Sequence, residues 1–349
     1  SPFLSTSIFS GAENVVCQII KAFSNDTKFD MAYCSTVGKN QTVLEEKNIK
    51  WIKLNNFSIR NLKKVVREYR PTIIHAHDIR ASLLATFFYR DCKIISHIHA
   101  NHENMRKFNV KTFLYNLVSQ RVNNIIWISK SALDNYYFKN KILSKSIVLY
   151  NVIDENEVLK KAELDKQKYG YDIIYLGRIT YQKDPLRLIE VIENVKKIKN
   201  DIKVAIIGDG DLLSKCVEEI SKKGLENNIK MYSFLSNPYK ILKNSKIMLM
   251  TSRYEGTPMC ALEAITFGKP IISTPTDGLV DLIENEKTGF LSNDNDRLVN
   301  YIVELLEDSN KYNIISDNVK KLSKRVNDVG GYKQKLEEVY CDGDKNEKN

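Results

Sequence analysis

Two glutamates are spaced so that they could act on one ligand. Glu255 lies in the polar segment RYEGT, and Glu263 follows it with seven residues between, inside the segment PMCALEAITF. If that segment is a helix, Glu263 lies one turn beyond Met259 and on the same face. Both carboxylates could then face one ligand. A glutamate on a helix is ordinarily a solvated surface residue, so the surrounding elements must decide.

Those elements read as strand, polar loop, helix and strand over residues 247–273. The strands are short apolar runs, which are typical of a parallel sheet buried on both faces. We expect Thr257 to be the N-cap and Pro258 the first helical residue, with Gly268 and Pro270 ending the helix. A helix that begins beyond a strand's carboxyl end directs unpaired N–H groups and a positive dipole end at the crevice, where anionic ligands bind.

The string Glu255-Gly256-Thr257-Pro258, followed by Ala261-Leu262-Glu263-Ala264, resembles the E-x7-E signature of the family 4 retaining glycosyltransferases, or group 1 glycosyl transferases. The resemblance implies an α/β protein of the GT-B fold, with two Rossmann-like parallel-sheet domains facing across a cleft. It also implies that Glu255 lies by the donor sugar and that Glu263 bonds the nucleotide ribose. Further donor contacts are implied for Gly256, Thr257, Pro258 and Met259.

Basic residues match a second motif of that family. Gly177-Arg178 with Lys183 resembles G-R-x4-K-G/N, in which the arginine and the lysine hold the donor diphosphate. The leaving diphosphate gains charge as the glycosidic bond breaks, and two fixed cations stabilise it without a metal. Near the N-terminus, Ser10-Gly11-Ala12-Glu13 resembles the family's G-G-A-E loop, where Gly11 would let the backbone approach the diphosphate. Ser10 departs from that pattern.

Histidines cluster after two expected strands. His97 and His99 lie two apart where a strand passes into a loop, so both rings could point to one face. By resemblance we favour His99 as the residue near the donor sugar and the acceptor. The other acceptor-side candidates are His97, Asn101 and His102. The H-x-H pair of residues 75–77 also resembles a family segment, and we expect a structural role for it.

We predict no metal site. Three histidines lie close together over residues 97–102, but no carboxylate or cysteine spacing supports metal binding there. The six cysteines are scattered without a C-x-x-C pair and mostly lie in apolar runs, so we also predict no disulfide and no zinc site. No cofactor is expected, because a nucleotide-sugar donor is a substrate.

Charge is distributed unevenly along the 349 residues. Residues 1–160 hold 23 Lys and Arg against 13 Asp and Glu, whereas residues 161–349 hold 30 of each. Such asymmetry can attract nucleic acid, anionic lipid or a phosphorylated substrate, although a lysine-rich proteome would also produce it. A basic and aromatic stretch over residues 105–122 is either a helix on a membrane surface or an ordinary amphipathic helix packed on the sheet. We expect no nucleic-acid partner.

Alternating strand and helix patterns predict βαβ units in two domains. The expected N-terminal, acceptor-side domain spans residues 1–155, with its first strand truncated, and the nucleotide-sugar domain spans residues 156–325. We expect Ser1-Pro2-Phe3 in the loop after that first strand, and the next strand at residues 29–35. The charged residues 155–170 are expected to be a linker. Residues 326–340 should return to the first domain, and residues 341–349 are expected to be a disordered tail. The sequence has no apolar run of 18 residues and no signal-peptide pattern, so we expect a cytoplasmic protein, at the inner face of the cell membrane where it meets its acceptor.

The resemblance implies a retaining, metal-independent glycosyltransferase that moves a sugar from a UDP-sugar to a glycan or polyprenyl-diphosphate-linked acceptor in bacterial surface polysaccharide synthesis. Two alternatives stay open: a nucleotide-sugar epimerase of GT-B fold, which needs no acceptor, and a non-catalytic partner subunit. A dinucleotide-dependent oxidoreductase is disfavoured, since no G-x-G-x-x-G opens either domain.

Overall fold

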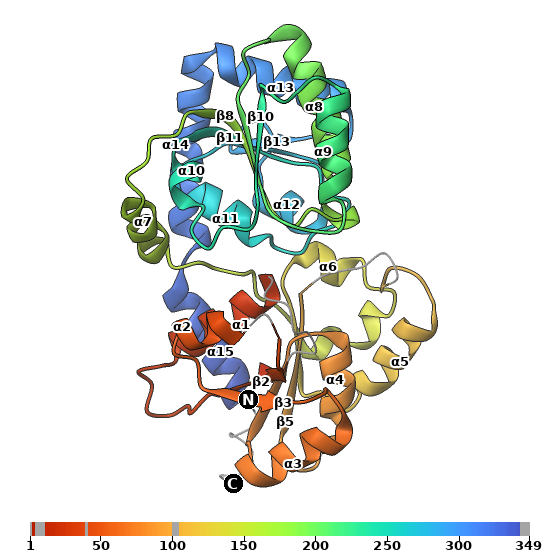
Figure 1. The fold of residues 1–349 in the computed structure, drawn as a ribbon. Coiled ribbons are helices and arrows are strands. Elements are labelled where there is room, and N and C mark those ends of the chain that lie inside the picture. The colour runs from red at the N-terminus through yellow and green to blue at the C-terminus, as the bar shows by residue number, and fades with distance from the viewer. Residues whose placement is uncertain (1, 4–10, 39–40, 100–104, 343–349) are drawn as a thin grey trace. The chain divides into compact units, whose positions relative to one another are not determined.

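The computed structural model describes residues 2–3, 11–38, 41–99 and 105–342, and it divides into two compact units. Unit 1 comprises Ser1–Asn151 and Val329–Asn349, and unit 2 comprises Val152–Asp328. Each unit contains one all-parallel sheet covered by helices on both faces (Figure 1). An all-parallel sheet with covered faces is the arrangement that βαβ units produce.

The sheet of unit 1 has the order β3-β2-β1-β4-β5-β6-β7. Its strands are β1 Pro2–Phe3, β2 Tyr33–Thr36, β3 Trp51–Leu54, β4 Ile73–Ala76, β5 Lys93–Ile98, β6 Asn124–Trp127 and β7 Ser146–Val148. Its helices are α1 Gly11–Ala22, α2 Gln41–Glu46, α3 Ile59–Tyr69, α4 Ile79–Ala85, α5 Val110–Ser119, α6 Lys130–Asp134 and α15 Val329–Cys341. In Figure 1, α1 and α15 lie on one side of this sheet, and α3, α4 and α5 lie on the other.

Unit 2 has a six-stranded sheet of order β10-β9-β8-β11-β12-β13. Its strands are β8 Tyr171–Leu176, β9 Val204–Ile207, β10 Ile229–Tyr232, β11 Ser245–Met250, β12 Ile271–Ser273 and β13 Gly289–Leu291. Its helices are α7 Glu155–Leu164, α8 Pro185–Ile198, α9 Leu213–Lys222, α10 Tyr239–Lys243, α11 Met259–Thr266, α12 Asp277–Leu282, α13 Asn295–Glu307 and α14 Ser309–Val326. Helices α8 and α9 cover one face, and α10 and α11 cover the other (Figure 1).

Polar side chains fix where several helices begin. The hydroxyl of Ser129 accepts from the backbone N–H of Ala132 at 3.1 Å, and Asn109 forms a capping box with Thr112. Each bond satisfies an N–H that has no partner inside the helix. Since these helices follow strand ends, their caps help to set the edge of the sheet at which polar loops gather.

Four expectations for the elements need correction. Pro2–Phe3, expected in a loop, is strand β1, because its backbone pairs with both β2 and β4. The strand expected from Phe29 begins only at Tyr33. The charged stretch expected as a linker contains helix α7, which Asp154 caps by accepting from the N–H of Glu157 at 3.1 Å. Cys341, expected in a disordered tail, is the last residue of α15, while residues 343–349 lie outside the described residues.

Candidate active site

A buried ion pair lies at the carboxyl end of the sheet in unit 2. Lys183, after β8, places its Nζ 2.5 Å from Oε1 of Glu255, in the loop after β11. Because β8 and β11 are neighbours in the sheet, their carboxyl ends bring these residues together across 72 positions of sequence. The Ser252 hydroxyl donates to the same oxygen at 2.6 Å, so Glu255 is held from two sides.

The ion pair keeps Lys183 protonated although its side chain is largely buried. Burial alone would lower the pKa of Lys183, but the negative charge of Glu255 and its hydrogen bond outweigh burial and raise the pKa. Its side chain is 12% exposed, and that of Glu255 is 5% exposed. A fixed ammonium group in such a site attracts a diphosphate more strongly than one in open water.

Helix α11 carries the second glutamate. Glu263 is 9% exposed, and burial raises its pKa to about 7, partly offset by a hydrogen bond from Tyr239. That bond joins the Tyr239 hydroxyl to Oε1 of Glu263 over 3.2 Å. The carboxyl group can therefore change its protonation near neutral pH, and it can accept hydrogen bonds from ligand hydroxyls when ionised.

The helix begins one residue later than expected. Pro258 is the N-cap of α11 and Met259 is its first residue, so Thr257, expected as the cap, lies one position before. The reason is the backbone of Pro258, whose ψ of 125° is extended rather than helical. Thr257 and Gly256 are buried in the loop that leads into the helix.

Gln182 connects Arg178 with this loop. Its side-chain oxygen accepts from Nη2 of Arg178 at 2.9 Å, and its Nε2 donates to the carbonyl of Tyr254 at 3.0 Å. Arg178 is exposed, and its positive charge partly opposes the rise in the pKa of Lys183 that Glu255 causes. Two cations and two carboxylates of unit 2 thus lie around the loops that follow β8 and β11.

A second loop packs tightly against the first. A Cβ atom added to Gly278, in α12, would lie 1.5 Å from the carbonyl oxygen of Gly256. The Thr274 hydroxyl also donates to the carbonyl of Ser252 at 2.6 Å. No side chain larger than glycine's fits at position 278 without moving the loop that holds Glu255.

The remaining candidates belong to unit 1. Gly11 is the exposed first residue of α1. His99 is half-buried, and burial lowers its pKa to about 3. His97 is fully buried on β5. Asn101 and His102, expected on the acceptor side, lie outside the described residues.

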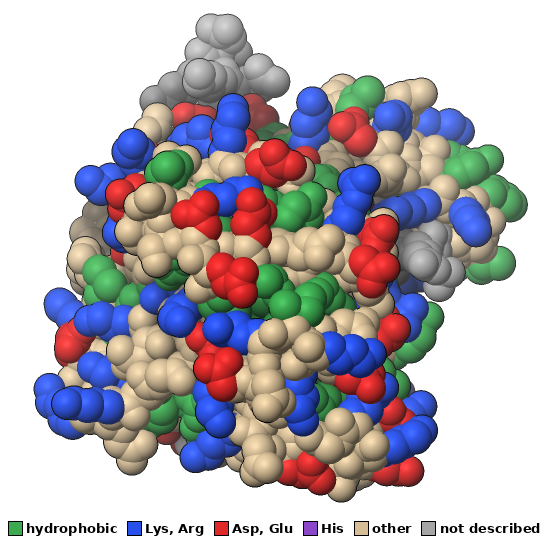
Figure 2. Space-filling model, turned by 90° about the horizontal axis from the view of Figure 1, so that it is seen from above, with side chains coloured by type: hydrophobic (Ala, Val, Ile, Leu, Met, Phe, Trp, Pro, Cys, Tyr) green, Lys and Arg blue, Asp and Glu red, His purple; other side chains and the backbone are tan. Residues whose placement is uncertain are grey.

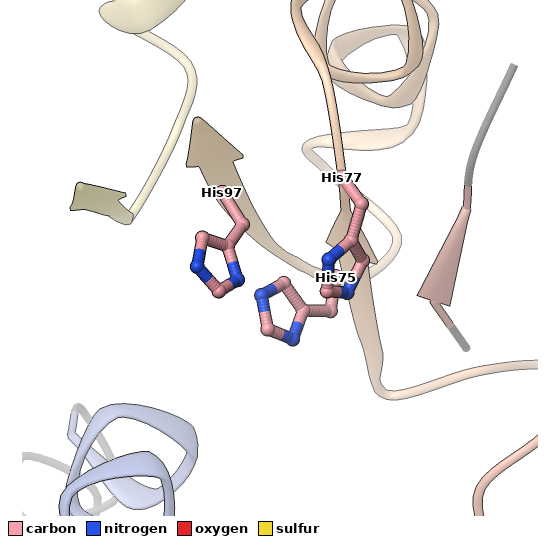
Figure 3. A group of neighbouring side chains, drawn as sticks. All are labelled: His75, His77 and His97. Atoms are coloured by element: carbon pink, nitrogen blue, oxygen red, sulfur yellow. The ribbon is translucent and has the colours of Figure 1, made fainter. Parts of the chain in front are cut away.

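Histidines of two neighbouring strands meet on one face of the sheet. His75 and His77, from the end of β4, lie beside His97 of β5 (Figure 3). Ring centroids of His75 and His77 are 4.2 Å apart, and Nδ1 of His77 is 2.8 Å from Nε2 of His99. Nδ1 of His75 is 2.9 Å from the Tyr340 hydroxyl of α15. The sequence interpretation grouped residues 97–102 and did not place His75 and His77 with them.

Four residues that support the site were not among the candidates: Gln182, Tyr239, Ser252 and Gly278. Gln182 and Ser252 lie within motif segments, so their positions carried a signal. No sequence signal pointed to Tyr239, because its partner Glu263 is 24 residues away and the contact depends on how α10 packs near α11.

Two Rossmann-like parallel-sheet units, one with fixed cations and carboxylates at the carboxyl ends of its strands, define a nucleotide-binding α/β protein of GT-B type. Residues 9–157 match the family described as "Glycosyltransferase Family 4", and residues 157–322 match that described as "Glycosyl transferases group 1". The two matches together cover residues 9–322, so the chain belongs to the family 4, or group 1, glycosyltransferases. It is a glycosyltransferase.

Individual relatives agree with this assignment. The uncharacterized glycosyltransferase MJ1059 of Methanocaldococcus jannaschii is 27% identical over 60% of the chain, which spans 57% of that relative's length. The UDP-Gal:alpha-D-GlcNAc-diphosphoundecaprenol alpha-1,3-galactosyltransferase of Escherichia coli is 24% identical, covering 96% of the chain and 94% of the relative. Anabaena Alr3699/HepE, crystallised with UDP and glucose, superposes with a TM-score of 0.83 at 18% identity, covering 97% and 98% of the two chains. This likeness establishes the GT-B fold.

Proposed function

We propose that this enzyme transfers a sugar, with retention, from a UDP-sugar to a hydroxyl of a glycan or of a polyprenyl-diphosphate-linked acceptor in bacterial surface polysaccharide synthesis. The buried pair Lys183–Glu255 beside the start of α11 carries the proposal. The donor and acceptor classes are suggested by the UDP in the HepE crystals and by the name of the E. coli galactosyltransferase.

Residues of unit 2 bind different parts of the donor. Lys183 and Arg178 bind the diphosphate and offset the charge that develops as the nucleotide leaves. N–H groups in the first turn of α11, beginning at Met259, add positive potential. Glu263 accepts hydrogen bonds from the ribose hydroxyls, and Glu255 orients Lys183 and the sugar. Gly11 of unit 1 lets the backbone approach the diphosphate.

These cations allow the reaction to proceed without a metal at the diphosphate or another cofactor. Retention is consistent with two routes: a covalent carboxylate intermediate, or deprotonation of the acceptor hydroxyl by the departing phosphate on the same face. We assign contact with the sugar or the acceptor to His99. Its ring is neutral at physiological pH, because burial lowers its pKa to about 3, so it can exchange hydrogen bonds with hydroxyls.

We also propose that α5 brings the enzyme to the cytoplasmic face of a membrane. This helix buries Thr112, Tyr115, Asn116 and Ser119 and exposes Val110, Phe113, Leu114 and Leu117, which reverses the usual amphipathic order. Basic Arg106 and Lys107 are exposed just before the helix, and Lys111 is exposed in its first turn. On the face shown in Figure 2, basic and acidic side chains are interspersed. Among the described residues, no helix has the length and apolar character to cross a bilayer.

The decisive experiment follows transfer and donor hydrolysis across a panel of nucleotide sugars in the presence of EDTA. We expect one UDP-sugar to release UDP in the wild type and roughly 100-fold less release in Lys183→Ala, the loss that follows removal of one donor from a charge-stabilising site. Glu263→Ala should weaken donor binding. Arg187→Ala, which removes a cation bonded to Asn293 and Asn295 rather than to Glu255, is the matched control and should keep full activity. Equal loss in all three variants, or epimerised donor without transfer, would contradict the proposal.

A further inference from the structure

Three buried histidines of unit 1 have nitrogens that point at no hydrogen-bond partner. Nε2 of His75, Nε2 of His77 and both ring nitrogens of His97 contact no donor or acceptor among the described residues. The three side chains are at most 3% exposed. A buried polar atom without a partner costs roughly 1–3 kcal/mol, so three such rings together call for an explanation.

The three rings lie close together. One nitrogen from each ring falls within 4.8 Å of the others, and Figure 3 shows the rings of His75 and His97 side by side with His77 next to them. Nitrogens bound to one tetrahedral Zn²⁺ lie about 3.4 Å apart, since each Zn–N bond is about 2.0–2.1 Å. The ring nitrogens therefore need to draw together by at most about 1.4 Å to share an ion.

The other nitrogens already have the bonds that a metal ligand requires. Nδ1 of His75 is 2.9 Å from the Tyr340 hydroxyl, and Nδ1 of His77 is 2.8 Å from Nε2 of His99. A proton on each Nδ1 donates to those partners and leaves both Nε2 atoms as bare lone pairs. Metal-binding histidines are oriented and held in one tautomer by this kind of outer bond.

We propose that His75, His77 and His97 form a binding site for one divalent transition-metal ion of the Zn²⁺ class. An all-imidazole set without carboxylate or thiolate suits Zn²⁺ rather than Mg²⁺ or Ca²⁺. The ion ties β4, β5 and, through Tyr340, helix α15 together.

None of the three ligands is a residue to which we assign a donor contact. His99, the outer partner of His77, is the residue assigned to the sugar or the acceptor. Metal binding by the three rings can still be measured without the proposed transfer reaction. The sequence interpretation discounted metal because it considered only the histidines after β5. The pairing of β4 with β5 brings His77 and His97 together, although they lie 20 residues apart in the sequence.

The test measures bound metal directly on untagged, full-length protein that has been stripped with EDTA and titrated with Zn²⁺ in equilibrium dialysis. We expect one saturable equivalent per chain in the wild type and its loss in His97→Ala. Tyr340→Phe removes only the outer partner of His75, so Kd should rise 10- to 100-fold. Tyr332→Phe is the matched control, because its hydroxyl, also buried in α15, has no hydrogen-bond partner among the described residues. Its Kd should equal that of the wild type.

Melting curves of each variant without metal show whether it folds. If His97→Ala does not fold, the comparison of Tyr340→Phe with Tyr332→Phe still decides, because both keep all three ligands. No saturable Zn²⁺ in the wild type overturns the proposal. One bound Zn²⁺ that persists in folded His97→Ala also overturns the proposal. So do equal Kd values for Zn²⁺ in Tyr340→Phe and Tyr332→Phe.

Discussion

At the scale of single residues, burial controls the pH at which the Glu263 carboxyl group ionises. A carboxyl group with a pKa of about 7 in the folded chain, against an ordinary 4.5, binds its proton more tightly when folded. Its contribution therefore favours the folded state at low pH, and the free energy of unfolding falls as pH rises from about 4.5 to about 7. Above that window the cost is constant, on the order of 3 kcal/mol.

Glu263→Gln should escape this cost, because an amide does not ionise. We expect its advantage in free energy of unfolding over the wild type to grow between pH 5 and pH 7 and then to level off. Urea unfolding of both proteins at four pH values measures it. Glu190→Gln, at an exposed position of α8, is the control. A difference that does not change with pH would show that the Glu263 pKa is not raised.

The pair Lys183–Glu255 makes a second prediction at this scale. Removing only the cation with Lys183→Met leaves a buried carboxylate opposite no charge, which costs about 3–5 kcal/mol. The double variant Lys183→Met/Glu255→Gln should recover most of that stability but none of the transfer activity. Denaturation and donor-release assays on the wild type, the two single variants Lys183→Met and Glu255→Gln, and the double variant separate the two effects. Additive losses of stability in the double variant would mean that the two side chains are not coupled.

At the scale of elements, the contact between Gly256 and Gly278 fixes the loop of Glu255 against α12. Gly278→Ala would place Cβ 1.5 Å from a backbone oxygen, so either helix α12 or the loop of Glu255 must move. We expect at least roughly tenfold weaker donor binding and a lower Tm, in line with the 1–3 kcal/mol typical of overpacking. Isothermal titration with UDP measures the binding.

Gly170→Ala is the control for that substitution. A Cβ atom there meets no heavy atom within 4 Å, and φ lies outside the left-handed region. Unchanged binding in Gly170→Ala alongside weak binding in Gly278→Ala would locate the effect in the loop contact. Equal behaviour of the two variants would contradict it.

The elements that the sequence predicts well are those whose signal is local. The apolar runs at Ile73 and Ile247 lie in strands, and the spacing from Glu255 to Glu263 leads into a helix. The errors occur where long-range packing overrides the local pattern. Charged residues over α7 suggest a linker, yet α7 is a helix whose buried Val158 packs in the core of unit 2. The bond of His75 to Tyr340 spans 265 residues, and nothing near either residue signals it.

For the whole molecule, the unequal charge of the two halves matters most for where the enzyme acts. The 10 excess basic residues all lie in residues 1–160, which include α5 and its exposed apolar side chains. Anionic lipid attracts such a surface, and buried apolar side chains add about 1.5–3 kcal/mol each when fully covered. The two contributions differ in their response to salt, since only the electrostatic one is screened.

The double variant Phe113→Ser/Leu117→Ser should therefore bind vesicles of phosphatidylglycerol and phosphatidylcholine at least about tenfold more weakly than the wild type, while keeping its fold, because both side chains are already exposed. Ile314→Ser, at an exposed apolar position of α14 in unit 2, is the matched control and should bind like the wild type. Vesicle sedimentation at low and high salt measures the electrostatic and the apolar contributions to binding. Weak binding by the wild type, or equal binding by the double variant, would mean that α5 exposes its apolar face to a partner other than lipid.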